Sequence, residues 1–288
     1  MPRGYILRAR DEVGSVPRLD QGSDDYRQRN RALSRPRIGY ALSGGAMRGA
    51  AHLGFLSVFE EAGIRPDVIA GTSAGAIVGA GYAAGVSVEH MSQRAKACTW
   101  REVTGAPRMQ AMSVFTTTPL SAWIERSIGD ITFEDLDIPL ATVACDIVEG
   151  TRVILKEGRV VEAAIASAAV PGLFAPVERD GMLLVDGGIL DNLPVGVARG
   201  MGADVVIAVD VSSSLRALRR PESLRDVMTC TLNIVASTNL GSRQEADFLV
   251  QPKMEEFSAW DFGRVQEIID AGREAALLVV PEVLALLG

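Results

Sequence analysis

The stretch VIAGTSAGAIVGAGYAA, residues 68–84, places the pattern G-x-S-x-G between an apolar run and a segment of small residues. The run Val68–Ala70 is typical of a buried strand, and the glycine- and alanine-rich Ala74–Ala84 predicts a closely packed helix. A serine in such a strand-to-helix turn forms a nucleophile elbow. The stretch therefore predicts that Ser73 lies at a helix N-terminus, where the dipole and free amides favour developing negative charge.

Glycine at the two flanking positions is the steric condition for this turn. A side chain at Gly71 or Gly75 would collide with the strand or the helix, so we expect both glycines to support the exposed Ser73 hydroxyl. The pattern alone carries little weight in a chain with 29 glycines. An ordinary glycine-rich turn is the alternative, and the flanking strand and helix favour the elbow.

From Ile38 onward, short apolar runs alternate with longer helical patterns. The expected strands are Ile38–Leu42, Val68–Ala70, Leu140–Asp146, Arg152–Leu155, Met182–Val185, Asp204–Val211 and Phe248–Val250. The expected helices are Met47–Ala62, Ala74–Ala84, Val160–Ala168, Pro221 to about Asn239, and a C-terminal helix around Phe262–Leu287 that is interrupted at Pro281. This alternation is typical of parallel strands joined by crossover helices. We expect an α/β fold with helices on both faces of a mostly parallel sheet.

The first 36 residues are rich in Arg, Asp, Ser and Gln and have few large apolar side chains. This composition predicts a mobile or loosely docked N-terminal arm, residues 1–36, ahead of one domain over residues 37–288. No apolar run of secretory length follows Met1, and the apolar stretches 70–86 and 275–287 are shorter than the roughly 20 residues of a spanning helix. We therefore expect a cytoplasmic protein.

The formal net charge of −7 argues against two classes of partner. It leaves no basic stripe for nucleic-acid phosphates, and adhesion to a membrane by a polybasic patch is also unsupported. The three cysteines, Cys98, Cys145 and Cys230, have no CxxC spacing. An odd number cannot form a fully paired disulfide framework, which favours a reducing compartment.

A glycine-rich turn, Ser43-Gly44-Gly45-Ala46-Met47-Arg48-Gly49, follows the first expected strand. Small residues let several backbone N–H groups point into one concavity, which suits a tetrahedral oxyanion. A phosphate site is the alternative, but the P-loop Gly-Lys-Ser/Thr is missing and Ala46 replaces the middle glycine of a dinucleotide site. A purely structural turn also stays open. Arg48 either charges this loop or covers a helix end.

The segment Val185-Asp186-Gly187-Gly188 places a carboxylate at the C-terminal end of an expected strand, where open parallel sheets form their sites. A hydrolase triad of the α/β type needs a histidine late in the chain, after the acid. The chain has two histidines, His52 and His90, and none follows. Both are expected to be structural or solvated. Asp186 is then the best remaining base for Ser73.

Periodicity is poor between Thr99 and Thr118, although this segment contains Met109, Met112, Val114 and Phe115. A lid or acyl-chain wall and an ordinary loop on the core are equally compatible with this pattern.

At these motifs the chain resembles the patatin-like phospholipases. The family patterns G-G-G-x-R/K-G, G-x-S-x-G and D-G-G/A are matched by residues 44–49, 71–75 and 186–188. Two further segments, 166–177 (ASAAVPGLFAPV) and 188–194 (GILDNLP), also resemble the family, so the match covers about residues 37 to 211. In this order the motifs are highly specific. The departure is Ala46 at the third glycine, where alanine donates the same N–H.

The resemblance implies a three-layer α/β/α fold and a serine acyl-ester hydrolase, a lipid acyl hydrolase of the phospholipase A type. It implies that Ser73 attacks the acyl carbonyl while Asp186 accepts its proton, and that water releases the fatty acid from an acyl-enzyme. The expected oxyanion hole is formed by Gly44, Gly45, Ala46 and Met47, with support from Arg48, Gly49, Gly71, Gly75, Gly187 and Gly188. No metal or cofactor is implied. The expected partner is a lipid or acyl ester, approached by transient contact with a membrane surface. A non-catalytic lipid-sensing module on the same fold is the alternative.

Overall fold

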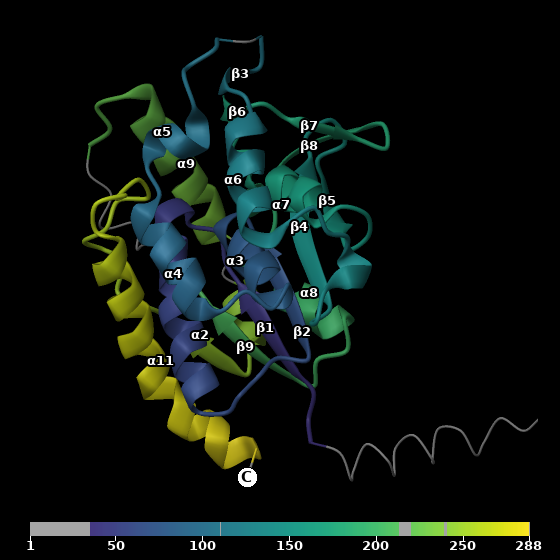
Figure 1. Cartoon of the computed structure of the whole chain (residues 1–288), viewed down its shortest axis with the longest axis vertical. Helices are drawn as coiled ribbons and strands as arrows, with labels where there is room; N and C mark the ends of the chain where they lie inside the picture. Colours follow the sequence, from purple (N-terminus) through teal and green to yellow (C-terminus); the bar gives the residue numbers. More distant parts are fainter. Residues whose placement is uncertain (1–34, 110, 213–219, 239–240, 288) are drawn as a thin grey trace, which may run out of the picture. The chain divides into compact units, whose positions relative to one another are not determined.

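The structure is a computed structural model that describes residues 35–109, 111–212, 220–238 and 241–287. The sheet and the helices that cover it belong to one compact unit, Pro36–Gly288 (Figure 1). The N-terminal arm predicted for residues 1–36 lies outside the described residues, apart from its last two.

A mixed sheet of eight strands forms the centre of the unit. Its strand order is β10 (Phe248–Val250), β9 (Val205–Val209), β1 (Ile38–Leu42), β2 (Val68–Thr72), β4 (Leu140–Asp146), β8 (Met182–Asp186) and β7 (Val177–Arg179), with β5 (Thr151–Leu155) paired to β4. The ladders from β10 through β4 are parallel, whereas β5, β8 and β7 join antiparallel. The prediction of an α/β fold with a mostly parallel central sheet is confirmed.

The strands alternate between two apolar layers, as expected for a sheet that is covered on both faces. In β1, Ile38, Tyr40 and Leu42 pack into the larger core cluster, whereas Ala41 belongs to the opposite one. The helices that pack into the larger cluster include α2 (Ala51–Glu61), α3 (Ala74–Ala83), α7 (Val160–Ala168) and α11 (Val265–Leu287). The opposite cluster includes side chains of α8 (Val195–Gly200). Helices therefore lie on both faces of the sheet.

Helices α2 and α11 cross at two glycines. A Cβ on Gly54 would overlap the carbonyl oxygen of Ile269, and a Cβ on Gly272 would overlap that of Ala51. The two backbones are therefore in direct contact, which only glycine permits at both positions. Figure 1 shows α11, in yellow, running beside α2 along this side of the unit.

The predicted interruption at Pro281 is wrong, because α11 continues through it to Leu287. Proline removes the hydrogen bond to the carbonyl four residues earlier, at Leu277. Leu277 and Pro281 are both exposed. Water can bind the released carbonyl at an exposed position, so the helix tolerates the proline there.

The segment between Thr99 and Thr118 is more ordered than its weak periodicity indicates. It contains α5 (Trp100–Thr104) and β3 (Ser113–Phe115), and β3 pairs in parallel with β6 (Gly172–Phe174). Phe115 is buried, whereas Met109 and Met112 are 86% and 57% exposed. The four apolar residues of this segment therefore do not act as one wall.

Short helices connect and cover the rest of the sheet. Those not yet placed are η1 (Ala46–Ala50), α4 (Val88–Ala97), α6 (Thr118–Ile128), η2 (Phe133–Asp135), η3 (Gly187–Ile189), α9 (Leu224–Thr238) and α10 (Gly241–Glu245). No helix within the described part of the chain has both the length and the apolar character that crossing a membrane requires.

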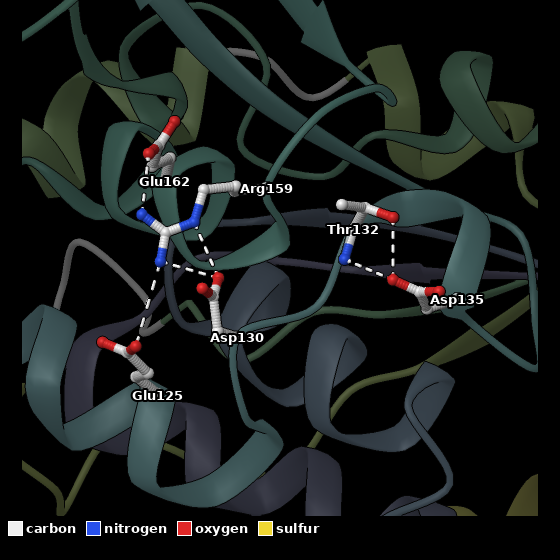
Figure 2. Close-up of polar contacts among 6 residues, drawn as sticks. All are labelled: Glu125, Asp130, Thr132, Asp135, Arg159 and Glu162. Atoms are coloured by element: carbon white, nitrogen blue, oxygen red, sulfur yellow. Dashed lines mark hydrogen bonds and ion pairs between the residues drawn. The ribbon is translucent and has the colours of Figure 1, made fainter.

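Arg159, the N-cap residue of α7, joins α7 to the end of α6 (Figure 2). Its guanidinium lies 2.7 Å from Asp130, 3.1 Å from Glu162 and 3.8 Å from Glu125 of α6. Beside it, Thr132 and Asp135 form a capping box for η2. Exposed ion pairs contribute little to stability individually. Because these ion pairs are exposed, we expect them to orient the start of α7, while burial of the apolar side chains of α7 holds the helix in place.

Candidate active site

The register of the sheet brings Ser73 and Asp186 together. Thr72 of β2 pairs with Val143 of β4, and Asp186 of β8 pairs with the next residue, Ala144. Strand β5 pairs with β4 over residues 142–146, overlapping both ladders, so β2 and β8 must share the opposite edge of β4. The end of β2 and the end of β8 therefore meet head to head on that edge.

This arrangement differs from the expectation for Asp186 in one respect. The carboxylate does stand at the C-terminal end of a strand, but β8 runs antiparallel to β4. The two strand ends consequently converge from opposite directions. A hydrogen bond links the Ser73 side chain to the Asp186 carboxylate.

Ser73 adopts the strained backbone of a nucleophile elbow, with φ 53° and ψ −118°. A Cβ on Gly71 would lie 2.6 Å from the carbonyl oxygen of Gly75, and a Cβ on Gly75 would overlap the carbonyl of Leu42 in β1. Neither position accepts a larger residue without moving backbone. The left-handed conformation costs a non-glycine residue roughly 1–2 kcal/mol, so the surrounding structure must hold it.

Ser167 near the C-terminal end of α7 supplies part of that support. Its Oγ accepts a hydrogen bond from the Ser73 backbone N–H at 2.8 Å and donates one to the Val143 carbonyl at 2.5 Å. The side chain is fully buried. Ser167 thus ties the elbow to the strand that also pairs with Asp186.

Asp186 is 6% exposed, and burial raises the pKa of its carboxyl from 3.8 to about 6. Hydrogen bonds from the Ser73 hydroxyl and from the Gly188 N–H, at 2.8 Å, oppose this rise because they stabilise the charged form. A Cβ on Gly187 would overlap the Val143 carbonyl. The carboxylate is therefore held in a site that makes it a stronger base than an exposed aspartate, yet leaves it ionised near neutral pH.

The glycine turn lies beside Ser73, but its four candidate oxyanion donors are not equivalent. The Gly44 N–H donates to the Asn192 carbonyl at 3.1 Å, and the Met47 N–H donates to the Ala259 carbonyl at 3.0 Å. Among the described residues, the N–H groups of Gly45 and Ala46 have no hydrogen-bond partner. Both residues line the cavity that contains Ser73. The structure therefore leaves two of the four predicted donors available.

Ala46, the residue that departs from the family pattern, has a φ of 50°. This left-handed conformation is the one that glycine adopts without strain, which gives a physical reason for the family's third glycine. A further member of the turn, Gly49, packs so closely that a Cβ would lie 2.5 Å from that of Ala74. The turn and helix α3 are thereby in direct contact.

Arg48 brings a buried positive charge to the same cavity. It is 3% exposed, its guanidinium donates to the Asn233 Oδ1 of α9 at 2.9 Å, and its Nε donates to the Gly45 carbonyl at 3.5 Å. Burial lowers its pKa to about 10, and the nearby Asp210 opposes this. Arg48 is still protonated at neutral pH, so it charges the loop as well as bracing it.

The two histidines stand apart from the Ser–Asp pair. His52 is fully buried in α2 and donates from Nε2 to the Ser43 carbonyl at 2.9 Å, and burial lowers its pKa to about 4. Its other ring nitrogen has no partner among the described residues. His90 lies in α4, where its backbone N–H is bound by Ser87. Among the described residues, neither histidine lines a cavity that Ser73 also lines.

Two cavities open on either side of Ser73, and both also include Ala46, Val170 and Trp260. We call the first, of about 80 Å³, the polar cavity, because the charged and hydrogen-bonding side chains near Ser73 line it beside apolar ones. It contains Asp186 and is further lined by Arg48, Asn192, Ser212 and Asn233. The second, of about 150 Å³, is apolar and is lined by side chains of α2, α3, α4, α5 and α6, among them Leu53, Ile77, Trp100, Leu120 and Trp123. We call the second the acyl cavity.

Of the interpretations left open for the segment with Met109, Met112, Val114 and Phe115, the acyl-chain wall is not supported, because none of the four lines this cavity. The two methionines lie in solvent, whereas Phe115 packs on Trp100 and Phe174, which line the cavity in its place.

Several site residues were not found from the sequence. Ser167 and Asn192 fall within the two segments that resemble the family, which is the signal that identifies them. Asn233 lies 185 positions after its partner Arg48, and Ala259 contacts Met47 through its backbone. No local pattern marks either one. Within the described residues, no cluster of three or more His, Cys, Asp or Glu side chains is placed to hold a metal ion.

The chain is similar in sequence to several known proteins. The chain is 38% identical over 188 residues to an uncharacterized NTE family protein of Mycobacterium tuberculosis, covering 65% of this chain and 52% of that protein. It is 36% identical over 205 residues to human patatin-like phospholipase domain-containing protein 6, covering 68% of this chain and 15% of that one. It is 30% identical over 283 residues to lysophospholipase NTE1 of Candida glabrata, covering 87% and 16%.

The chain thus spans about half the length of the mycobacterial relative and a small part of the other two. Among solved structures, VipD of Legionella pneumophila shares the fold, with a TM-score of 0.53 at 12% identity over 86% of this chain and 67% of that one. The family model for patatin-like phospholipase matches residues 40–199, more than half of the sequence. This chain belongs to the patatin-like phospholipase family.

Proposed function

We propose that the protein is a lipid acyl hydrolase that cleaves carboxylic esters with a Ser73–Asp186 dyad. One observation carries the proposal. A strained, hydrogen-bonded serine meets a buried carboxylate of raised pKa at the junction of a polar cavity and an apolar one. Perturbed carboxylates in a cleft are candidates for acid/base catalysis.

In the first half-reaction, Asp186 takes the Ser73 proton as Oγ attacks the acyl carbonyl carbon. The resulting oxyanion is placed to accept hydrogen bonds from the N–H groups of Gly45 and Ala46. Asp186 then returns the proton to the departing alcohol, and the acyl group stays on Ser73. In the second half-reaction Asp186 takes a proton from a water, whose oxygen attacks the acyl carbonyl carbon. The bond to Ser73 Oγ then breaks, Asp186 returns the proton to Oγ, and the fatty acid leaves.

The two cavities assign the two parts of the substrate. The acyl cavity has an apolar lining that suits a hydrocarbon chain, and the polar cavity next to Arg48 suits an alcohol carrying polar or anionic groups. This arrangement favours a phospholipid or lysophospholipid over a neutral ester.

A fluorophosphonate probe tests the nucleophile, because its phosphonyl adduct resembles the tetrahedral intermediate. We expect one adduct, located on Ser73 by peptide mass spectrometry, and none in Ser73→Ala. An adduct that persists in Ser73→Ala would remove Ser73 from this role. Lipid profiling of the purified protein beside Ser73→Ala then identifies the substrate class.

A non-catalytic lipid-sensing module is the alternative on this fold. It predicts lipid binding without turnover, so a folded wild-type protein that hydrolyses no chromogenic ester and takes up no probe would support it. The intact dyad argues against it.

A further inference from the structure

A second apolar cavity lies directly behind the acyl cavity. It has a volume of about 60 Å³ and is lined by residues of α2, α3, α4 and α6. We call it the distal chamber; the residues that line it alone are Gly81, Val86, His90, Met91, Arg94, Ile124, Ser127 and Ile128. Five residues line both spaces, namely Leu53, Ile77, Val78, Ala95 and Trp123. The wall between the two cavities is therefore one layer of side chains thick.

Trp123 of α6 is the largest side chain in this shared wall, and Arg94 of α4 holds it in place. The Arg94 guanidinium lies 5.2 Å from the centre of the indole ring and donates a hydrogen bond to the Trp123 carbonyl at 3.1 Å. Its Nε is buried with no partner among the described residues. A cation over an indole face and a hydrogen bond to the same residue fix the ring between the two cavities.

We infer that Trp123 sets the length of acyl chain that the protein accepts, by closing the acyl cavity against the distal chamber. The inference rests on the proposed function, because it takes the substrate's acyl chain as the occupant. Chains that fit in front of Trp123 bind fully in the acyl cavity. A longer chain meets the indole and must bend or leave its end in water. With the wall opened, the distal chamber receives the end of the chain.

The size of the effect follows from the free energy of burying hydrocarbon. Each methylene that moves from water into an apolar cavity favours binding by about fourfold. We therefore expect kcat/KM to rise by up to about fourfold per methylene along a series of esters and then to level off or fall. The length at which it levels off is the quantity that Trp123 controls.

The test compares wild type with Trp123→Ala on p-nitrophenyl esters from acetate to stearate. We expect the most favoured chain in Trp123→Ala to be several carbons longer, with kcat/KM on that chain at least tenfold above the wild-type value. Leu120→Ala is the matched control, because Leu120 lies one turn earlier on α6 and lines the acyl cavity but not the shared wall. It enlarges the acyl cavity without opening the chamber, so its profile should not shift to the longer chains.

A second substitution refills the chamber. Ile128 lines the distal chamber and not the acyl cavity. Adding Ile128→Phe to Trp123→Ala should return the favoured chain length towards that of wild type. If Trp123→Ala does not fold, Trp123→Phe keeps an aromatic ring in the wall and should give a smaller shift in the same direction.

A binding measurement separates failure of this inference from failure of the proposed function. In the Ser73→Ala background, thermal stabilisation by free fatty acids from octanoate to stearate should favour longer chains when Trp123→Ala is added. That result would support the role of Trp123 in limiting chain length even if the wild type hydrolysed no ester. Folded Trp123 variants with the wild-type length dependence in both assays would overturn the inference and leave the Ser–Asp mechanism intact.

Discussion

At the scale of single residues, the proposed chemistry depends on a carboxylate that is buried and still ionised at neutral pH. An exposed aspartate is a weak base towards a hydroxyl, because its proton affinity is too low. Burial raises the Asp186 pKa to about 6, while two hydrogen bonds keep the charged form accessible. In the proposed mechanism, Asp186 does alone what a histidine does in a Ser-His-Asp triad.

Replacement of Asp186 by asparagine tests this role. Asparagine keeps the size and one acceptor but cannot take up a proton, so we expect a folded variant with kcat lower by roughly 10²–10⁴-fold. The control replaces His52 and His90 together by glutamine, whose amide can still donate to the Ser43 carbonyl. Most of the activity should remain. A folded but inactive double histidine variant, or a nearly normal Asp186→Asn, would contradict the dyad.

The pH dependence of activity follows from the direction of the Asp186 pKa shift. The base works only when ionised, so kcat/KM should rise with pH through one apparent pKa near 6 and level off above it. The rise should be unchanged in the double histidine variant. If part of the pH dependence of kcat/KM disappeared when either histidine was replaced, an imidazole would take part in the reaction.

The same shift predicts a dependence of stability on pH. A carboxyl whose folded-state pKa is raised binds its proton more tightly in the folded state, so its stabilising effect is complete below about pH 4 and is lost as pH rises through about 6. At about 1.36 kcal/mol per pH unit, the ionised group costs roughly 3 kcal/mol above pH 6. Asp186→Asn avoids this cost. Urea unfolding should therefore show the variant gaining that much stability relative to wild type between pH 4 and pH 7.

Single residues could be predicted from the sequence where a short motif dictates local geometry. Gly71, Ser73 and Gly75 follow from one strand-to-helix turn. The sequence does not predict that the Gly44 and Met47 N–H groups are already hydrogen-bonded. Their acceptors, the carbonyls of Asn192 and Ala259, lie 148 and 212 positions later in the chain. Which amides remain for an oxyanion is decided by these distant backbone contacts.

At the scale of elements, the crossing of α2 and α11 depends on Gly54 and Gly272. Alanine in a helix is normally favoured over glycine by about 1 kcal/mol. At Gly54 the new methyl would overlap the Ile269 backbone, so the helices must separate. We expect Gly54→Ala to destabilise the protein by roughly 1–3 kcal/mol or more, measured by urea unfolding.

Gly196 of α8 is the matched control for this substitution. Its added Cβ would meet its nearest neighbour at 3.9 Å, which is ordinary contact. Gly196→Ala should leave stability unchanged or raise it slightly. Equal effects at both positions would show that the helix crossing is not what requires glycine.

Elements with a strong pattern could be predicted closely, and those with a weak pattern could not. The bounds of β1, β4 and β10 agree with the expected strands. Strands β3, β6 and β7 have three residues each, too few to show a period. Strand β10 is equally short, but its three residues are all large and apolar, which is the pattern that marks it. The antiparallel direction of β8 is set by pairing with β4 and leaves no mark in its own sequence.

At the scale of the whole molecule, the family match ends before the fold does. The matched residues 40–199 leave out β9, which pairs with β1 inside the sheet, and α11, which packs on α2. Five side chains of α11 are buried in the core shared with the sheet, namely Val265, Ile268, Ile269, Ala276 and Val283. The segment after residue 199 is therefore part of the unit that positions Ser73.

Two truncations test this organisation. Removing residues 265–288 uncovers the α2 face at Gly54 and strips those five side chains from the core. Burial of each large apolar side chain contributes roughly 1.5–3 kcal/mol, so the total is comparable to the whole stability of a domain. We expect this variant to lose cooperative thermal unfolding and all esterase activity.

Removing residues 1–34 is the opposite case. Their composition, poor in large apolar side chains, predicts that the domain does not depend on them. The shortened protein should keep the wild-type Tm within a few degrees and the wild-type kcat/KM on a short-chain ester. A large fall in Tm would show that the arm is a structural part of the domain. Lost activity at an unchanged Tm would show instead that the arm contributes to the site. An unchanged Tm means that the core is still folded, so the loss would have to arise at Ser73 and Asp186 and not from unfolding.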